Sequence, residues 1–138
     1  MSYAFLHDNE LFQTGWLEDG RWQQLTDTFA VLNLATGDTI AQVAKAGKTE
    51  TEQAIAAAAR AFPVWRAKTA KERADILQRW YQLMIENKSW LGRLRTAEQG
   101  KPLKEAEGEG EYAARVLEWV AERAKGANGE IPTPSTPG

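Results

Sequence analysis

The spacing of apolar residues changes near Thr49, and this change constrains the fold more than any other feature of the sequence. Beyond Thr49 apolar residues recur every three or four positions, which is the spacing of one face of an α-helix. The residues that form these faces are Ile55, Ala58, Phe62, Trp65, Ile76, Leu77, Trp80, Leu83 and Met84. Before Thr49 there are short alternating runs separated by turn residues. The chain is therefore predicted to begin with short strands and to continue as a series of helices.

Two short hairpins are predicted in residues 11–45. The dipeptide Asp19-Gly20 lies between two tryptophan-bearing runs and has the composition of a tight two-residue turn. The run Ala35-Thr36-Gly37-Asp38 reverses the chain a second time. Hairpins of this length are marginal in water, so both are expected to lie on another part of the protein.

Two pairs of residues have the spacing of a capping box, which marks the start of a helix. Thr49 precedes Glu52 by three positions, and Thr69 precedes Glu72 by the same interval. In each pair the hydroxyl and the carboxylate can accept backbone N–H groups that have no partner within the helix. Pro63 lies inside the first helical pattern, so a kink or a restarted turn is expected there.

A third and a fourth helix are predicted after residue 88. Ser89 is expected to cap the third helix and Gly100 to end it. Pro102 suits the first position of the fourth helix, which Gly126 and Gly129 would end. The inward face of the fourth helix is predicted to comprise Leu103, Ala106, Gly110, Ala113, Leu117, Val120 and Ala124.

Small residues in the first half of the fourth helix indicate close packing. Gly108 and Gly110 should each cost about 1 kcal/mol relative to alanine in a helix interior. We therefore expect the stripe at Gly110 and Ala113 to contact another backbone element. Trp80 and Leu83, on the most amphipathic run of the chain, are expected to be buried.

The overall fold class predicted in isolation is α+β, mostly helical with two short antiparallel strand pairs. Residues 1–129 form one segment, with hairpins in 11–45 and helices in 49–126. Residues 130–138 contain three prolines in nine positions, so they are predicted to be an extended linker or tail. A length of 138 residues suits a single domain.

Composition excludes several classes of function. There is no cysteine, so thiolate metal sites and cysteine nucleophiles are excluded, and His7 is the single histidine. Lys plus Arg number 17 against 19 Asp plus Glu, a balance that does not favour nucleic-acid binding. No apolar run approaches the roughly 20 residues that span a bilayer, and the first residues lack a basic signal-peptide region. A cytoplasmic, soluble protein without a metal site is expected.

The residues that are candidates for chemistry also have ordinary structural interpretations. The glutamates of the fourth helix suit acid–base chemistry or a solvated charged face, and the second is favoured. These glutamates are Glu107, Glu109, Glu111 and Glu118. Trp65, Trp80 and Trp90 lie on apolar faces, which favours core packing over a ligand cage. No strand precedes the fragment at 108–110, so no phosphate-binding loop is predicted. No catalytic or cofactor-binding residue is therefore assigned.

Several runs of the chain follow one another in the order and spacing of a known family. They are Asp19-Gly20-Arg21-Trp22 and residues 33–41, 54–66, 69–74, 80–87, 98–109 and 112–119. Together they resemble the N-terminal stretch of the NAD(P)-dependent aldehyde dehydrogenase superfamily, and within it the succinate-semialdehyde dehydrogenase branch. The resemblance implies that the chain forms the N-terminal part of the α/β aldehyde dehydrogenase fold.

The resemblance also implies an activity that this chain does not complete. A full-length relative would oxidise an aldehyde, succinate semialdehyde in this branch, to its acid with NAD or NADP. In the family the dinucleotide site, the nucleophilic cysteine, its glutamate base and the oxyanion-hole asparagine all follow the stretch that ends here at Gly138. The chain alone is therefore expected to bind no cofactor and to be non-catalytic.

One site and one kind of partner follow from the resemblance. In the family the fourth helix borders the entrance of the substrate tunnel, and the matching inward positions are Tyr112 and Val116. Val116 stands where this branch often has an aromatic residue, and ordinary helix packing is the alternative for both. The expected partner is a second copy of the chain or the missing dehydrogenase portion. The alternatives are a non-catalytic helical module that binds a protein partner, and a truncated remnant.

Overall fold

The computed structural model describes residues 3–125. Its elements are α1 (Ala4–His7), β1 (Trp16–Glu18), β2 (Arg21–Gln23), β3 (Thr28–Leu32), β4 (Thr39–Ala44), α2 (Lys48–Ala67), α3 (Ala70–Glu86), α4 (Lys88–Gln99) and α5 (Leu103–Lys125). The predicted fold class is confirmed, because the chain is mostly helical with two short antiparallel strand pairs. The single-turn helix α1 was not predicted. The predicted helix end at Gly126 and Gly129 and the tail at 130–138 lie outside the described residues.

Both predicted hairpins are present. Asp19 and Gly20 both have positive φ, 50° and 77°, which is the geometry of the turn that favours this dipeptide. β1 pairs with β2 and β3 pairs with β4, each as a two-stranded antiparallel sheet. The β3–β4 hairpin contacts the segment before β1, where the Ala44 N–H donates to the Thr14 carbonyl at 2.8 Å. The Lys45 N–H donates to the Asp27 carbonyl at 2.9 Å and extends the β3–β4 pairing by one residue.

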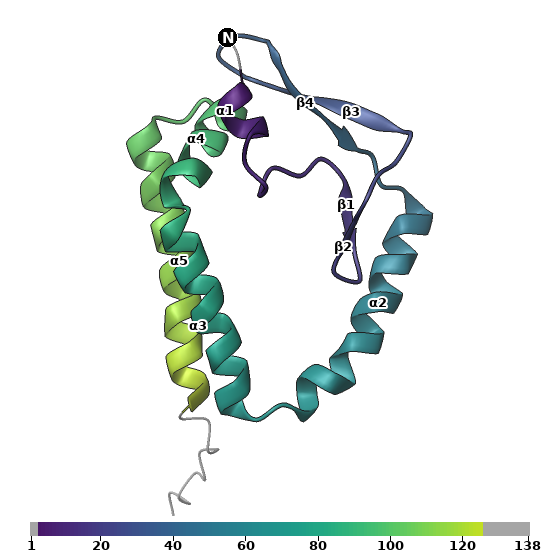
Figure 1. Cartoon of the computed structure of the whole chain (residues 1–138), viewed down its shortest axis with the longest axis vertical. Coiled ribbons are helices and arrows are strands. Elements are labelled where there is room, and N and C mark those ends of the chain that lie inside the picture. Colours follow the sequence, from purple (N-terminus) through teal and green to yellow (C-terminus); the bar gives the residue numbers. More distant parts are fainter. Residues whose placement is uncertain (1–2, 126–138) are drawn as a thin grey trace, which may run out of the picture.

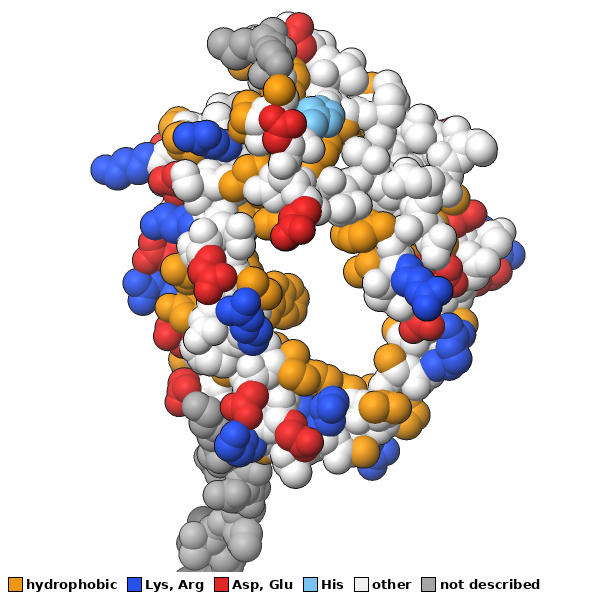
Figure 2. Space-filling model, viewed as in Figure 1, with side chains coloured by type: hydrophobic (Ala, Val, Ile, Leu, Met, Phe, Trp, Pro, Cys, Tyr) orange, Lys and Arg blue, Asp and Glu red, His pale blue; other side chains and the backbone are white. Residues whose placement is uncertain are grey.

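The elements are arranged as a ring. In Figure 1, α2 runs down one side, α3 and α5 run down the other, and the β3–β4 hairpin lies across the top. The space-filling view shows an opening through the middle of the molecule, bordered in part by hydrophobic side chains (Figure 2). At the top, the ring closes through a small cluster of Leu6, Ile40, Ala41 and Ala97. Within residues 3–125, Leu6 is the one large side chain that is completely buried.

Alanines line the contact between α3, α4 and α5. The buried side chains there are Ala74, Ala106, Ala114 and Ala121. The predicted inward face of α5 is correct in part: Ala106 is buried and Gly110, Leu117 and Ala124 are half-buried, but Leu103, Ala113 and Val120 are exposed. The most buried line of α5 runs through Ala114 and Ala121 instead of Ala113 and Val120, so the face is turned by less than the roughly 100° that separates consecutive residues.

The predicted burial of Trp80 and Leu83 was also wrong. Their exposed fractions are 55% and 41%, because α5 covers the side of α3 that carries Ala74. The predicted close approach at Gly108 and Gly110 was wrong as well, since a Cβ on either would meet no atom within 4 Å.

The close approach occurs instead at Gly92 of α4. A Cβ at this position would lie 2.5 Å from Cγ of Glu107 and 3.4 Å from the Glu107 backbone nitrogen. Gly92 therefore lets α4 pack tightly against the first turns of α5.

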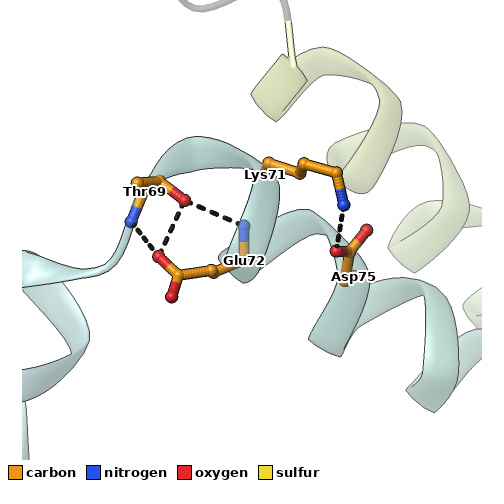
Figure 3. Close-up of polar contacts among 4 residues, drawn as sticks. All are labelled: Thr69, Lys71, Glu72 and Asp75. Atoms are coloured by element: carbon orange, nitrogen blue, oxygen red, sulfur yellow. Dashed lines mark hydrogen bonds and ion pairs between the residues drawn. The ribbon is translucent and has the colours of Figure 1, made fainter.

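The start of α3 is the capping box that the sequence predicted (Figure 3). The Thr69 N–H donates to Oε2 of Glu72 at 2.7 Å, and the Glu72 N–H donates to Oγ1 of Thr69 at 3.2 Å. One turn into the helix, Lys71 donates to Asp75 at 2.8 Å. These contacts satisfy N–H groups that have no partner within the helix.

Two other predicted caps were each displaced by two residues. α2 begins after Gly47, whose N–H donates to the Glu50 carboxylate at 2.7 Å, so the pair Thr49 and Glu52 does not cap it. α4 begins after Asn87, which places Ser89 inside the helix. In both helices the N-cap is a residue that lies two positions before the predicted one, Gly47 in α2 and Asn87 in α4.

The remaining helix signals gave mixed results. Gly100 ends α4 with φ 69°, as predicted. Pro102 precedes α5 instead of occupying its first position, and its carbonyl accepts the N–H groups of Glu105 and Ala106, both at 3.0 Å. α2 continues through Pro63 without a restart. None of the helices within residues 3–125 combines the length and hydrophobicity that crossing a bilayer requires.

Candidate functional site

The predicted site residues Tyr112 and Val116 lie together on the uncovered side of α5. They form an exposed row with Trp119, which we call the α5 strip, and the three exposed fractions are 74%, 47% and 59%. With Arg115 they line a shallow hollow of about 370 Å³. The Arg123 guanidinium lies 4.7 Å from the centre of the Trp119 ring. The buried side of α5 carries Ala106, Ala114 and Ala121.

Trp119 and Arg115 belong to this surface but were not proposed from the sequence. They lie seven and three residues after Tyr112, which is the spacing of one helical face. Once Tyr112 and Val116 are proposed, helical periodicity alone is enough to find both.

The glutamates of α5 make ion pairs to α4 and its flanking residues. Lys88 Nζ donates to Oε2 of Glu111, and Nη2 of Arg115 donates to Oε1, both at 2.8 Å. These two cations, Lys88 first, lower the pKa of Glu111 to about 2. Such a carboxylate stays ionised at neutral pH and cannot serve as a general acid.

A second shared carboxylate lies two residues earlier in α5. Glu109 binds Lys101 through a short hydrogen bond and forms an ion pair with Arg95 at 2.7 Å. Its hydrogen bond to Lys101 is the main cause of its lowered pKa. The predicted solvated face is thus in part a set of cross-links between helices, and the acid–base interpretation gains no support.

An apolar groove lies where α3 meets α4. It has a volume of about 360 Å³ and is lined mainly by Leu11, Trp80, Leu83, Met84, Trp90 and Leu91. The indole N–H of Trp90 is buried and has no hydrogen-bond acceptor among the described residues. Trp80, and Trp65 with 38% of its surface exposed, are not core residues here, so the core-packing prediction was wrong for these two.

The helix α2 carries a second uncovered apolar face. Its small residues, Ala54, Ala57, Ala58 and Ala61, lie near Leu17 and the Asp19-Gly20 turn. Arg60 reaches Asp19 at 3.7 Å. Ile55 and Phe62, turned away from that contact, are 64% and 60% exposed.

Glu98 lies beside a small hollow between the hairpins and α4. The hollow has a volume of about 130 Å³ and is lined mostly by apolar side chains, among them Phe12, Ile40 and Leu94. Burial in these surroundings raises the pKa of Glu98.

The described residues do not fit a metal ion or a dinucleotide. Residues 3–125 contain no group of three His, Asp or Glu side chains placed to hold a metal. In the doubly wound fold, a dinucleotide binds where a parallel strand leads through a glycine-rich turn to a free helix N-terminus. Both sheets here are antiparallel, and carboxylates occupy the N-termini of α2 and α3 through Glu50 and Glu72.

Comparison with known proteins places this geometry in a family. Residues 22–138 match the model of the aldehyde dehydrogenase family. The chain is 52% identical over 127 residues to a glutarate-semialdehyde dehydrogenase of Pseudomonas aeruginosa and 50% identical over 127 residues to an NADP⁺ succinate-semialdehyde dehydrogenase of Escherichia coli K12. Each match covers 91% of this chain and 26% of the relative. A 3-sulfolactaldehyde dehydrogenase of Pseudomonas putida is 50% identical over 133 residues, covering 94% of this chain and 27% of that protein.

Solved structures agree with this assignment. A crystal structure of an E. coli NADP-dependent enzyme superposes with a TM-score of 0.83 at 48% identity, over 89% of this chain and 26% of that one. Betaine aldehyde dehydrogenase from Staphylococcus aureus in complex with NAD⁺ superposes with a TM-score of 0.85 at 27% identity, over 96% of this chain and 28% of that one. The chain therefore spans about a quarter of the length of the relatives it matches, and it belongs to the aldehyde dehydrogenase family.

Proposed function

We propose that this chain is the N-terminal portion of an NAD(P)-dependent enzyme that oxidises succinate semialdehyde to its acid. The observation that carries the proposal is identity of about 50% with glutarate- and succinate-semialdehyde dehydrogenases over nine-tenths of the chain. Both names describe an aldehyde that also carries a carboxylate. The third relative, named for 3-sulfolactaldehyde, pairs the aldehyde with a sulfonate.

Within that enzyme, the α5 strip borders the entrance of the substrate tunnel. The exposure of Tyr112 and Val116 supports this role, since their side chains are free to contact a small molecule. The hollow between them is lined by apolar surface, which suits the hydrocarbon part of an aldehyde.

The apolar surfaces that are exposed in this chain become buried against the rest of the dehydrogenase or against a second copy of the chain. Ile55 and Phe62 of α2 and Trp80 of α3 are each more than half exposed, and large apolar side chains left open on one helix face are typical of an interface. The same observation supports a second candidate, a non-catalytic helical module that binds a protein partner.

The 138 residues alone carry out no oxidation. The absence of cysteine supports this, because the reaction needs a thiolate to attack the aldehyde, and so does the poor fit of the described residues to a dinucleotide. The test incubates the purified chain with succinate semialdehyde and NAD⁺ or NADP⁺ while absorbance reports the reduced cofactor. No signal is expected.

A matched arm joins the chain to the remaining length of the E. coli succinate-semialdehyde dehydrogenase, and this joined enzyme is expected to reduce the cofactor. Turnover that stays with the 138-residue chain through repurification would contradict its catalytic silence. A folded joined enzyme that oxidises no aldehyde would contradict the proposed function.

A further inference from the structure

The junction between α2 and α3 is short and extended. α2 ends at Ala67 and α3 begins at Ala70, so Lys68 and Thr69 alone connect the two helices. The backbone angles are φ −66° and ψ 144° at Lys68, and φ −62° and ψ 158° at Thr69. Backbone of this polyproline-like kind makes no hydrogen bonds within itself, so it does not fix the angle between the helices that it joins.

The side chain of Arg73 crosses this junction. It starts from the first turns of α3, and its Nη1 donates to the Lys68 carbonyl at 2.9 Å. The same nitrogen lies 3.5 Å from the carbonyl oxygen of Arg66, in the last turn of α2. Carbonyls at the end of a helix have no partner within that helix, and a charged donor makes a stronger hydrogen bond to them than a neutral one.

The position of this charge suits α2 better than α3. A cation near the N-terminus of a helix opposes the helix dipole, whereas a cation at a C-terminus is favoured. In the first turns of α3, Glu72 caps the helix and Lys71 is paired with Asp75 at 2.8 Å. Arg73 is half-buried and donates to the last carbonyls of α2 and the junction. Its contact with the end of α2 therefore explains a cation at the start of α3.

The junction closes the lower end of the ring (Figure 1). Hydrophobic side chains border part of the opening (Figure 2). Phe62 of α2 and Trp80 of α3 are 60% and 55% exposed. If the junction could bend freely, the two sides would be drawn together, because their approach would remove apolar surface from water.

We propose that Arg73 is a brace that fixes the angle between α2 and α3 and thereby holds the ring open. The brace keeps the apolar faces of both sides accessible, so a partner can bind without first separating them. The use of this surface by a dehydrogenase rests on the proposed function, whereas the brace itself is tested on the 138-residue chain.

Double electron–electron resonance between two spin labels measures the opening. The chain has no cysteine, so Ala59→Cys in α2 and Ala113→Cys in α5, both at exposed positions, provide the two labelling sites. In the parent, a single narrow distribution of distances between the labels is expected. Arg73→Gln is expected to abolish the narrow peak, broaden the distribution and shift its mean to a shorter distance. Helix content, measured by circular dichroism, should stay the same.

Arg79→Gln is the matched control. Arg79 lies on the same helix as Arg73 and contacts Glu86 of that helix at 3.5 Å, so its substitution removes the same charge without touching the junction. It is expected to leave the distribution of distances as it is in the parent.

Each outcome bears on the brace. A broad distribution in the parent, an unchanged distribution in Arg73→Gln, or equal broadening in Arg79→Gln overturns it. If Arg73→Gln does not fold, nitrogen-15 NMR of the parent decides. Rotation of the Arg73 guanidinium that is slower than that of the exposed Arg21 supports the brace, and equally fast rotation overturns it. Aldehyde oxidation by the joined enzyme tests the proposed function alone, so the two can fail separately.

Discussion

The two sides of the ring are built from similar amphipathic helices but differ in what covers them. On one side α3, α4 and α5 pack together through alanines, and α5 is tied to α4 by the carboxylates of Glu109 and Glu111. On the other side α2 buries Ala57 against the hairpin region and leaves Ile55 and Phe62 exposed. The difference shows that an apolar stripe predicts a helix face that is buried in the complete assembly, but does not identify the element or partner that packs against it.

Side-chain size accounts for part of this contrast. Small residues let helix backbones approach closely, and Gly92 and Ala114 occupy such positions. Several large apolar residues of α2 and α3, among them Ile55, Phe62 and Trp80, are instead left exposed by the contacts made within residues 3–125. These large side chains are therefore the surface that a partner would bury.

The largest expected effect comes from overpacking the alanine contact. Ala114→Leu introduces a large side chain where no surface is exposed, and it should lower the free energy of unfolding by about 1–3 kcal/mol. Ala113→Leu, the neighbouring and exposed position, should change it by less than about 0.5 kcal/mol. Urea unfolding of both variants measures the difference. Equal losses would mean that the register of α5 against α3 differs from that described.

A smaller effect distinguishes the starts of the helices on the two sides. Thr69→Ala removes the hydroxyl that accepts the Glu72 N–H and should cost about 1 kcal/mol of stability. Thr49→Ala should have an effect within about 0.5 kcal/mol, because Gly47 and Glu50 form the start of α2. Thermal unfolding of the two variants makes the comparison. A larger loss at Thr49 would show that the capping box expected from the sequence is the real one.

The smallest effect concerns the pH dependence of the α4–α5 ion pairs. Lys88 and Arg115 lower the pKa of Glu111 from its usual 4.5 to about 2. A lowered carboxyl pKa contributes stability above pH 4.5, and that contribution is lost as the pH falls through about 2. Glu111→Gln should therefore lose less stability than the parent between pH 4.5 and pH 2, by a small margin because the pair is partly solvated.

Carbon-13 NMR of the glutamate carboxyls checks the cause directly. In the parent, Glu111 should titrate near pH 2, and Arg115→Gln should move its midpoint upward toward 4.5. A Glu111 carboxyl that titrates near 4.5 in the parent would show that the ion pairs do not hold in solution.

The features predicted correctly from the sequence depend on residues close together in the chain. Asp19-Gly20, Gly100 and the pair Thr69 and Glu72 each contain the whole signal within a few positions. The cap expected at Thr49 failed because Gly47 and Glu50 offered an equally local alternative that the pattern did not separate.

The features predicted wrongly depend on tertiary contacts, that is, on which helices pack against each other. Ala113 and Ala114 are both small and apolar, so periodicity alone cannot decide which of them faces α3. Trp80 lies on a strongly amphipathic helix, but no element within residues 3–125 packs over its side chain enough to bury it. Tyr112 and Val116 were proposed from the family resemblance, and the contact of Arg115 with Glu111 became visible only in the structure.

The burial of Leu6 has a consequence for the order of folding. Leu6 and Ala97 meet in one cluster although about ninety residues separate them, and closing a loop of that length costs about 4 kcal/mol of chain entropy. The contacts among α3, α4 and α5 close much shorter loops, so they can form first and without the N-terminal residues. The seam at Leu6 is then the last part of the ring to form, and amide hydrogens around it should exchange sooner than those beneath the alanines of α5.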